Sequence, residues 1–496
     1  MIRLSVVAVG LNHRDTDNFK DNIRLVNQNS QLRSSLCANV FFGRLHLGRE
    51  VSFKASDLRV RTSKAILPSS ESSAETGPVI SNSHRWWVVF LLFVASLINY
   101  LDRATVSMAL PLLSRELSLG PETKGLLLSA FFWSYAAMQI PIGWCADRFN
   151  LRWFYAALFT LWSLAQGLTG LATGLGTMIA CRVALGVGES IYLPGGTKIV
   201  SLLFSHEERG LPSGLFDCGT RTGLVVGGLL LPWLLVHYGW RRTFLLVGLS
   251  ALFWLVPWLL VTPRRLRGNT PAAEPQHVPD SVAPRKPLQR LGVHVLRVVA
   301  LLQNRNLVGI CLGFFCFDYY WYLLVGWLPD YLVTVRHLTI LRAGLYTALP
   351  FFVFGISEPI GGWIADGLIK RGWGETHTRK GIVTVAFLTG LLLIPAARVE
   401  TPPAAIILVI GGSLVGLATG NLIVILQCCA PRDQVGVWTG WENFAGNVAG
   451  VVAPLATGLL ISRTGSYAPA FALAAAVLLA GLVSYWFIVG ELKPGS

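Results

Sequence analysis

Long apolar runs, each close to the length that a helix needs to cross a membrane, fill the sequence from residue 84 onward. About 20 helical residues cover the hydrocarbon core of a bilayer, which is roughly 30 Å thick. Only 14% of the 496 residues are charged and the mean hydropathy is +0.55, which excludes an ordinary soluble protein. We predict twelve membrane-spanning helices, at 86–112, 124–146, 153–173, 176–200, 211–236, 243–261, 304–333, 342–365, 381–397, 404–428, 435–461 and 467–489. The predicted fold class is an all-α polytopic membrane protein.

A long polar segment, rich in proline and basic residues, divides the predicted helices into two sets of six. We predict that this segment, 262–303, is a flexible cytoplasmic linker between an N-terminal half, 84–261, and a C-terminal half, 304–490. Residues 1–83 are polar and of mixed charge, which predicts a disordered extension, and 491–496 form a short cytoplasmic tail. The expected architecture is two pseudo-symmetric six-helix bundles.

The distribution of basic residues predicts the orientation of the chain. With a cytoplasmic N-terminus, about 17 Lys and Arg residues fall on the cytoplasmic side and about 8 on the opposite side. The positive-inside rule therefore favours both termini in the cytoplasm, and it accounts for the net charge of +15 without a nucleic-acid partner. We expect a monomer in the plasma membrane, as in a bacterial inner membrane, with the lipid bilayer as its surroundings.

A short loop motif occurs once in each half, after the second predicted helix and after the eighth. The copies are GWCADRFNLR at 143–152 and GWIADGLIKR at 362–371. The glycine allows a close helix approach, the acid can bind backbone N–H groups or a base, and the basic residues suit the cytoplasmic membrane face. The residues assigned to this loop motif are Gly143, Asp147, Arg148, Arg152, Gly362, Asp366 and Arg371.

Two acids and two bases lie inside predicted spans of the N-terminal half, where isolated charges are costly. Arg182 and Glu189 are seven residues apart, so they share one helix face. Asp102 and Arg103 are neighbours and point about 100° apart, so only one of them can face a central cavity. The four charges cancel when both acids are ionised. Protonation of either acid leaves a positive charge that attracts an anion.

Four sequence motifs carry a resemblance to a known family. They are NYLDR at 99–103, RVALGVGE at 182–189, GWRRTF at 239–244 and FFCFDYYWYLLVGWLPDYL at 314–332. With the twelve-span layout, the linker and the repeated loop motif, residues 84–490 resemble the major facilitator superfamily, and the four motifs resemble its anion:cation symporter branch. That branch contains bacterial proton-coupled carriers of sugar acids such as hexuronates, galactonate and glucarate.

The resemblance implies roles for the four charged residues. Arg103 would hold the substrate carboxylate, Asp102 and Glu189 would carry protons, and Arg182 would be the charge partner that couples them, with Asp102 turned toward Arg182. The loop motif would gate the cytoplasmic side. A salt-bridge network that only pins helices together is the alternative for the same residues.

Polar and aromatic residues near these charges suit a polyhydroxylated anion. The further substrate-binding candidates are Asn99, Tyr100, Tyr135, Arg221, Tyr320, Trp441, Asn443 and Asn447. Each could instead pack or bond a neighbouring helix. Arg221 follows Asp217 by four residues, so the two can pair along one helix; otherwise Arg221 is a second anion-binding cation. Asp318 has no evident partner in the sequence, and Glu358 precedes Pro359, which suggests a kink or a gate.

The predicted function is a proton-coupled symporter that imports a small organic anion, most simply a hexuronate, aldonate or aldarate. Protons are the coupling ion and no other cofactor or metal is expected, because the cysteines and histidines form no metal-binding pattern. The chain lacks the Walker loop, nucleophile elbow and HExxH signatures, so an enzyme is not expected. An organophosphate-type antiporter and a non-transporting sensor of the same ligands remain alternatives.

Overall fold

The computed structural model describes residues 82–204, 208–264, 266, 303–431 and 434–492, and within these ranges it contains helices and no strands. The described residues all belong to one compact unit. The predicted extension 1–83 and the predicted linker 262–303 fall almost entirely outside the described residues, as does most of the tail.

Most helices of the N-terminal half begin or end where turn residues interrupt the apolar pattern. Asn150 caps one of them by accepting a hydrogen bond from the backbone N–H of Arg152 at 3.1 Å. The elements are α2 (Asn82–Leu117), α3 (Pro121–Arg148), α4 (Leu151–Thr169), α5 (Leu175–Glu189), α6 (Tyr192–Leu203), α7 (Gly210–Ala251), η3 (Leu252–Trp254) and α8 (Leu255–Val261).

The first two helices of the C-terminal half also begin at polar capping residues. Asn304 and Thr339 cap the first two by accepting hydrogen bonds from the backbone of the first turn. The elements are α10 (Arg305–Thr334), α11 (Ile340–Lys370), α12 (Glu375–Gly390), α13 (Leu393–Arg398), α14 (Pro402–Gly412), η4 (Ser413–Ala418), α15 (Thr419–Cys429), α16 (Val435–Thr464), α17 (Ala468–Val483) and η5 (Ser484–Ile488).

Within the described ranges, nine helical segments are long and apolar enough to cross a membrane. One of them, Leu211–Val261, bends at Gly239, whose φ of 72° lies in the left-handed region, so it supplies two crossings. The shorter α4 and the interrupted pair α5–α6 supply two more. This reading agrees with the twelve spans that the apolar runs predict, and it confirms an all-α membrane fold.

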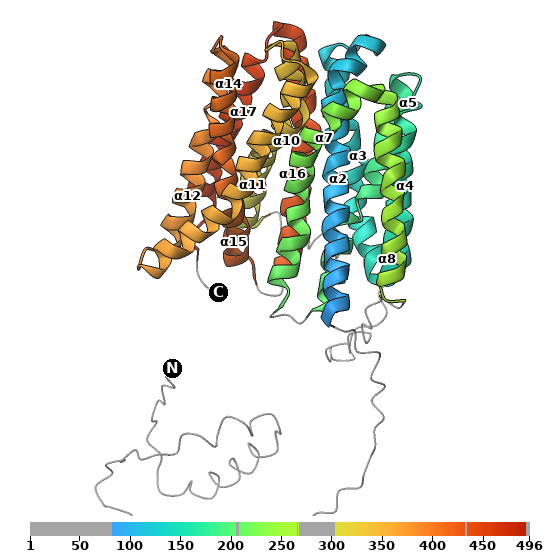
Figure 1. The fold of residues 1–496 in the computed structure, drawn as a ribbon. Coiled ribbons are helices and arrows are strands. Elements are labelled where there is room, and N and C mark those ends of the chain that lie inside the picture. Colours follow the sequence, from blue (N-terminus) through green and yellow to red (C-terminus); the bar gives the residue numbers. More distant parts are fainter. Residues whose placement is uncertain (1–81, 205–207, 265, 267–302, 432–433, 493–496) are drawn as a thin grey trace, which may run out of the picture. The chain divides into compact units, whose positions relative to one another are not determined.

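The two halves pack against each other along α3 and α16 and along α7 and α11. We call the end where α8 ends and α10 begins the linker end, and the opposite end the far end (Figure 1). Near the far end the contacts are too tight for side chains. A Cβ added to Gly125 would lie 2.5 Å from the carbonyl oxygen of Pro454, and one added to Gly344 would lie 2.1 Å from Cγ of Pro232. Glycine therefore allows the backbones of the two halves to meet there.

Candidate functional site

A buried ion pair joins α2 to α5 in the N-terminal half. Nε of Arg103 donates a hydrogen bond to Oε2 of Glu189 at 3.0 Å, and the two side chains are 5% and 0% exposed. Glu189 is the last residue of α5. A charge removed from water needs a partner of opposite charge. Neutralising Glu189 would therefore leave the Arg103 guanidinium without a counter-ion and able to bind another anion.

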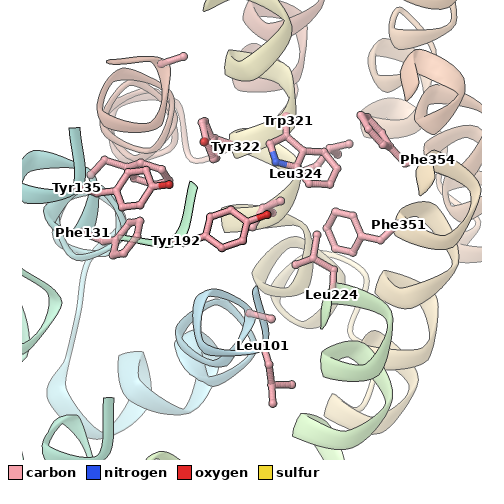
Figure 2. Packing of buried hydrophobic residues seen from close by; sticks show 14 of the residues in the cluster. Leu101, Phe131, Tyr135, Tyr192, Leu224, Trp321, Tyr322, Leu324, Phe351 and Phe354 are labelled. Carbon is pink, nitrogen blue, oxygen red and sulfur yellow. The ribbon is translucent and has the colours of Figure 1, made fainter. Parts of the chain in front are cut away.

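Three aromatic rings surround the Arg103 guanidinium. Its central carbon lies 4.7 Å from the ring centre of Tyr100, 4.6 Å from that of Phe131 and 4.7 Å from that of Tyr135. At these distances cation–π attraction holds the guanidinium in place. Figure 2 shows Phe131 and Tyr135 together on α3, on the side that faces Tyr322 of α10. Nη2 of Arg103 is buried and has no hydrogen-bond partner among the described residues, so a donor remains for a ligand carboxylate.

Arg182, on α5, is a second buried cation close to this pair. It is 3% exposed and lies 5.2 Å from the centre of the Phe131 ring. Its Nε and Nη1 atoms have no hydrogen-bond partner, and among the described residues no acid lies within 4 Å of it. Two unused donors on a fixed planar group suit an oxyanion.

Asp102 is fully buried, and within the described residues it forms no ion pair. It interacts electrostatically with Glu189 and Arg182, but neither carboxylate oxygen has a hydrogen bond within the described residues. In this conformation Arg103 pairs with Glu189, and the roles predicted for the four charged residues stay predictions. Asp102 points about 100° away from Arg103, on the side of α2 where Gln166 of α4 donates to its backbone oxygen.

A small cavity lies between the halves beside these residues. Its volume is about 20 Å³, room for one or two water molecules. Its lining residues come from α2, α3 and α5 on one side and from α10 and α16 on the other: Tyr100, Arg103, Val106, Ser107, Leu128, Phe131, Phe132, Arg182, Tyr322, Val325, Gly326 and Pro454. The rings of Phe132 and Tyr322 meet edge to face across the two halves at 4.5 Å. A sugar acid is larger than this space, so the halves have to move before one can bind.

Arg221 pairs across the halves and not along its own helix. Nε and Nη2 of Arg221 donate to Oε1 of Glu358 at 2.9 and 2.5 Å, and the guanidinium lies 4.6 Å from the ring of Trp321. Asp217, the partner expected from the i,i+4 spacing, accepts a hydrogen bond from the hydroxyl of Tyr192 at 2.9 Å. Arg221 can pair with Glu358 because α11 passes close to it at Gly355. A Cβ added to Gly355 would lie 3.2 Å from Cβ of Arg221.

The remaining substrate-binding candidates lie in different surroundings. Tyr320 is fully buried and donates to the carbonyl of Gly412 at 3.0 Å, so its hydroxyl serves packing inside the C-terminal half. Asn447 donates to the backbone and side-chain oxygens of Asn443, at 2.8 and 3.2 Å. Trp441, partly buried, meets Phe444 edge to face. None of these four predicted residues lines the cavity.

Asn99 is a further predicted residue with an unused side chain. It is fully buried, and neither polar atom of its amide has a hydrogen-bond partner within the described residues. It lies near Glu189. The amide can therefore serve as a donor to that carboxylate when the surroundings shift.

The loop motif lies at the linker end in both halves. Asp147 pairs with Lys198 of α6 at 2.7 Å, and Asp366 pairs with Arg379 of α12 at 3.1 Å. Arg148 stacks on Trp144 at 3.8 Å. The other motif residues are Gly143, whose built Cβ meets only Pro194 at 3.9 Å, Gly362, with open space at its Cβ, Arg152, which donates to the carbonyl of Leu259, and Arg371, at the end of α11.

Sequence reasoning missed an ion pair that joins the halves near the far end. Nζ of Lys124, on α3, donates to both carboxylate oxygens of Asp330, on α10, at 2.9 Å. The hydroxyl of Tyr467 donates to the same carboxylate at 2.5 Å. In the sequence, Lys124 resembles a basic residue of a loop between helices, and Asp330 lies within a motif rich in aromatic residues. The usable signal was two opposite charges at the far ends of facing apolar runs.

Known proteins with a similar sequence identify the family of this fold. Residues 92–454 match the family model of the Major Facilitator Superfamily. The probable galactarate/D-glucarate transporter of Bacillus subtilis is 30% identical over 427 residues, which cover 83% of this chain and 93% of the relative. The D-galactonate transporter of Escherichia coli is 29% identical, with coverage of 82% and 96%. The chloroplastic ascorbate transporter of Arabidopsis thaliana is 29% identical, with coverage of 86% and 81%.

Solved structures show the same fold. A bacterial homolog of the human lysosomal transporter Spinster, inward-facing and unoccupied, aligns with a TM-score of 0.66 at 19% identity, over 82% of this chain and 98% of that one. A D-xylose–proton symporter aligns with a TM-score of 0.63 at 15% identity, over 82% and 98%. The chain therefore belongs to the Major Facilitator Superfamily, a family of membrane transporters and not of enzymes.

Proposed function

We propose that this protein is a proton-coupled symporter that imports a sugar acid, with the aldonates and aldarates as the leading substrates. The observation that carries the proposal is the buried Arg103–Glu189 pair beside Arg182, a cation with unused donors, at a cavity between the halves. The names of the relatives support the substrate class, since galactarate, D-glucarate and D-galactonate are all sugar acids.

Competition for one guanidinium is the proposed coupling mechanism. When Glu189 is ionised it occupies Nε of Arg103 at 3.0 Å. When a proton neutralises Glu189, the charge of Arg103 becomes available, and a substrate carboxylate can bind its fork with two hydrogen bonds. Loss of that proton on the other side restores the internal pair and expels the substrate. The halves rock around the site between these events.

Uptake by proteoliposomes tests the proposal. D-galactonate, galactarate and D-glucarate should accumulate only with an inward proton gradient, and neutral D-galactose should not accumulate. A Glu189→Gln variant should exchange internal for external substrate, because this step needs no net proton movement, and should lose accumulation driven by the gradient. Glu116→Gln is the matched control, because Glu116 lies in an exposed ion pair with Arg241 at 2.9 Å. Equal accumulation of a sugar acid with and without the gradient would contradict proton coupling.

An anion antiporter is the second candidate, and a specific observation favours it. Arg103 and Arg182 both line the cavity, and two arginines suit a phosphate group as well as a carboxylate. An organophosphate antiporter has no need of Glu189, so the Glu189→Gln variant should then keep full exchange of glycerol 3-phosphate for inorganic phosphate. A protein that binds these ligands without exchange is instead a sensor.

We also propose a monomer in the plasma membrane, with both termini in the cytoplasm, as in a bacterial inner membrane. The likeness to a chloroplastic transporter makes an organelle envelope the alternative location. Fluorescent fusions to the full chain distinguish the two membranes. A membrane-impermeant maleimide tests the orientation, since a single cysteine placed in 262–303 should react only after the membrane is opened.

A further inference from the structure

Two buried carboxyls in the C-terminal half form no ion pair with any basic residue that the structure describes. Asp318 on α10 is 9% exposed and Glu442 on α16 is 5% exposed. Neither carboxyl forms an ion pair or a hydrogen bond within the described residues, and Oε1 of Glu442 is buried. The N-terminal half balances its buried acids with Arg103 and Arg182, whereas the arginines that act on Asp318, Arg103 and Arg221, form their ion pairs with other acids.

A glycine brings the two acids together. Gly446 lies one turn after Glu442 on α16, and a Cβ added there would lie 2.1 Å from Oδ2 of Asp318. The Asp318 carboxylate therefore rests against the backbone of α16. Residues four apart on a helix lie on one face, about 5–6 Å between their Cβ atoms. Asp318 and Glu442 thus face each other over about one helical turn, and they interact electrostatically.

A third buried polar group interacts electrostatically with this pair. The hydroxyl of Tyr485, on η5, is fully buried and has no hydrogen-bond partner within the described residues. Its ring lies against Gly313 of α10, where a built Cβ would be 2.3 Å from its Cε2. Among its electrostatic neighbours, Glu442 is the strongest and Asp318 is another. A phenol can donate to a carboxylate or accept from a carboxylic acid, so it suits a group that gains and loses a proton.

The surroundings favour a proton over a metal ion. Among the described residues, no group of three or more His, Cys, Asp or Glu side chains could hold a metal. The other titratable or charged groups that face the pair are Arg103, Arg221, Tyr322, Cys311 and Cys316. The two arginines are already occupied by Glu189 and Glu358. Two neighbouring carboxylates in a buried site, with no ion pair of their own, cannot both stay ionised, so one proton bound by the pair is the simplest resolution.

We propose that Asp318 and Glu442 form a second proton-binding site, which takes one proton from water on one side of the membrane and returns it to water on the other during transport. An O–H bond forms on one carboxyl when the site loads and breaks when it empties. The part that this site would play in the transport cycle rests on the proposed symport function. Its ability to bind a proton does not rest on that function, because proton binding can be measured without substrate.

Proton uptake by the purified full-length protein tests the site itself. A pH-sensitive dye counts the protons bound between about pH 9 and pH 4, and infrared difference spectra detect the carbonyl band of a protonated carboxyl. The Asp318→Asn/Glu442→Gln double variant, which keeps the side-chain shapes, should bind fewer protons and lose one band. Tyr485→Phe should keep the proton and shift that band. An unchanged proton count and unchanged spectra in the double variant would overturn the proposal.

The number of protons moved per substrate tests the part in the cycle. The potential at which net D-galactonate flux reverses in proteoliposomes gives this number, and it should fall by one in the double variant and stay unchanged in Glu116→Gln. A double variant that loses the infrared band but keeps the proton number would show a static protonated pair and overturn the transport role. If the unmodified protein moves no sugar acid with protons, the proposed function fails, while the spectra still decide the site.

Discussion

Replacing Lys124 with alanine should open the far end of the transporter. Lys124 and Asp330 belong to opposite halves, and their side chains are 10% and 1% exposed. The lysine donates to both carboxylate oxygens at 2.9 Å. In the variant, the Asp330 carboxylate stays buried with the hydroxyl of Tyr467 as its hydrogen-bond donor. Any conformation in which Asp330 reaches water then becomes more favourable.

The magnitude follows from the burial of the pair. Removing one partner of a buried ion pair costs about 3–5 kcal/mol, because the remaining charge is uncompensated. Since about 1.4 kcal/mol is a factor of ten, the ratio of closed to open far ends should fall by roughly 10²- to 4 × 10³-fold. The glycine contacts at Gly125 and Gly344 remain in the variant. We therefore expect a shifted equilibrium and not an unfolded protein.

Spin labels can measure this equilibrium. Ser118 and Leu341 are exposed near the far end, one in each half. Distances between labels at these positions should be short in the parent and longer in most molecules of Lys124→Ala. Glu116→Gln is the control, because Glu116 forms an exposed ion pair with Arg241 at 2.9 Å within one half. A folded Lys124→Ala protein with the parent distance distribution would refute the claim that this pair closes the far end.

Three further predictions concern packing and the anion site. Gly125→Val should also lengthen the distance between the far-end labels, since its side chain would collide with the carbonyl of Pro454, and an unchanged distance would contradict that contact. Tyr135→Ala should raise the KM for uptake roughly 2- to 30-fold, from a loss of about 0.5–2 kcal/mol of cation–π energy, whereas Tyr135→Phe should stay near the parent. Arg221→Gln should lower the melting temperature in detergent, and adding Glu358→Gln should recover part of it, because the double variant leaves no buried charge alone; additive losses would refute this coupling.

The number and order of the membrane crossings were predictable from the sequence, but their internal breaks were not. The length of an apolar run decides whether a helix can cross the hydrocarbon core of a membrane, so crossings can be predicted from the sequence. Breaks depend on which helix packs beside them. The interruption between the predicted spans 211–236 and 243–261 does coincide with the bend at Gly239. The predicted span 404–428, however, is interrupted by the tighter turns of η4, and the predicted span 176–200 by the break between α5 and α6. Both features are set by tertiary packing and leave no periodic signal.

The inventory of charged residues was also predictable, but not their pairing. Spacing along a helix tells which side chains share a face, so Asp217 was the local partner expected for Arg221. The structure instead pairs Arg221 with Glu358, 137 residues away, because α7 and α11 meet at Gly355. Such partners are determined by which helices pack together, and these contacts cannot be read from a single sequence.

The positions of the ion pairs constrain how a proton can be coupled to movement of the halves. Arg103–Glu189 lies within one half, whereas Lys124–Asp330 and Arg221–Glu358 join the halves on either side of it along the bundle. In the proposed symport cycle, protonation at Glu189 therefore changes the affinity for an anion but breaks neither contact between the halves. In that cycle, opening is driven by a ligand that reaches both halves at once. A sugar acid can do this if its carboxylate binds Arg103 while its hydroxyl groups contact the wall around Tyr322, across the cavity. A carboxylate without such a polar chain, such as acetate, should bind weakly and should not be transported.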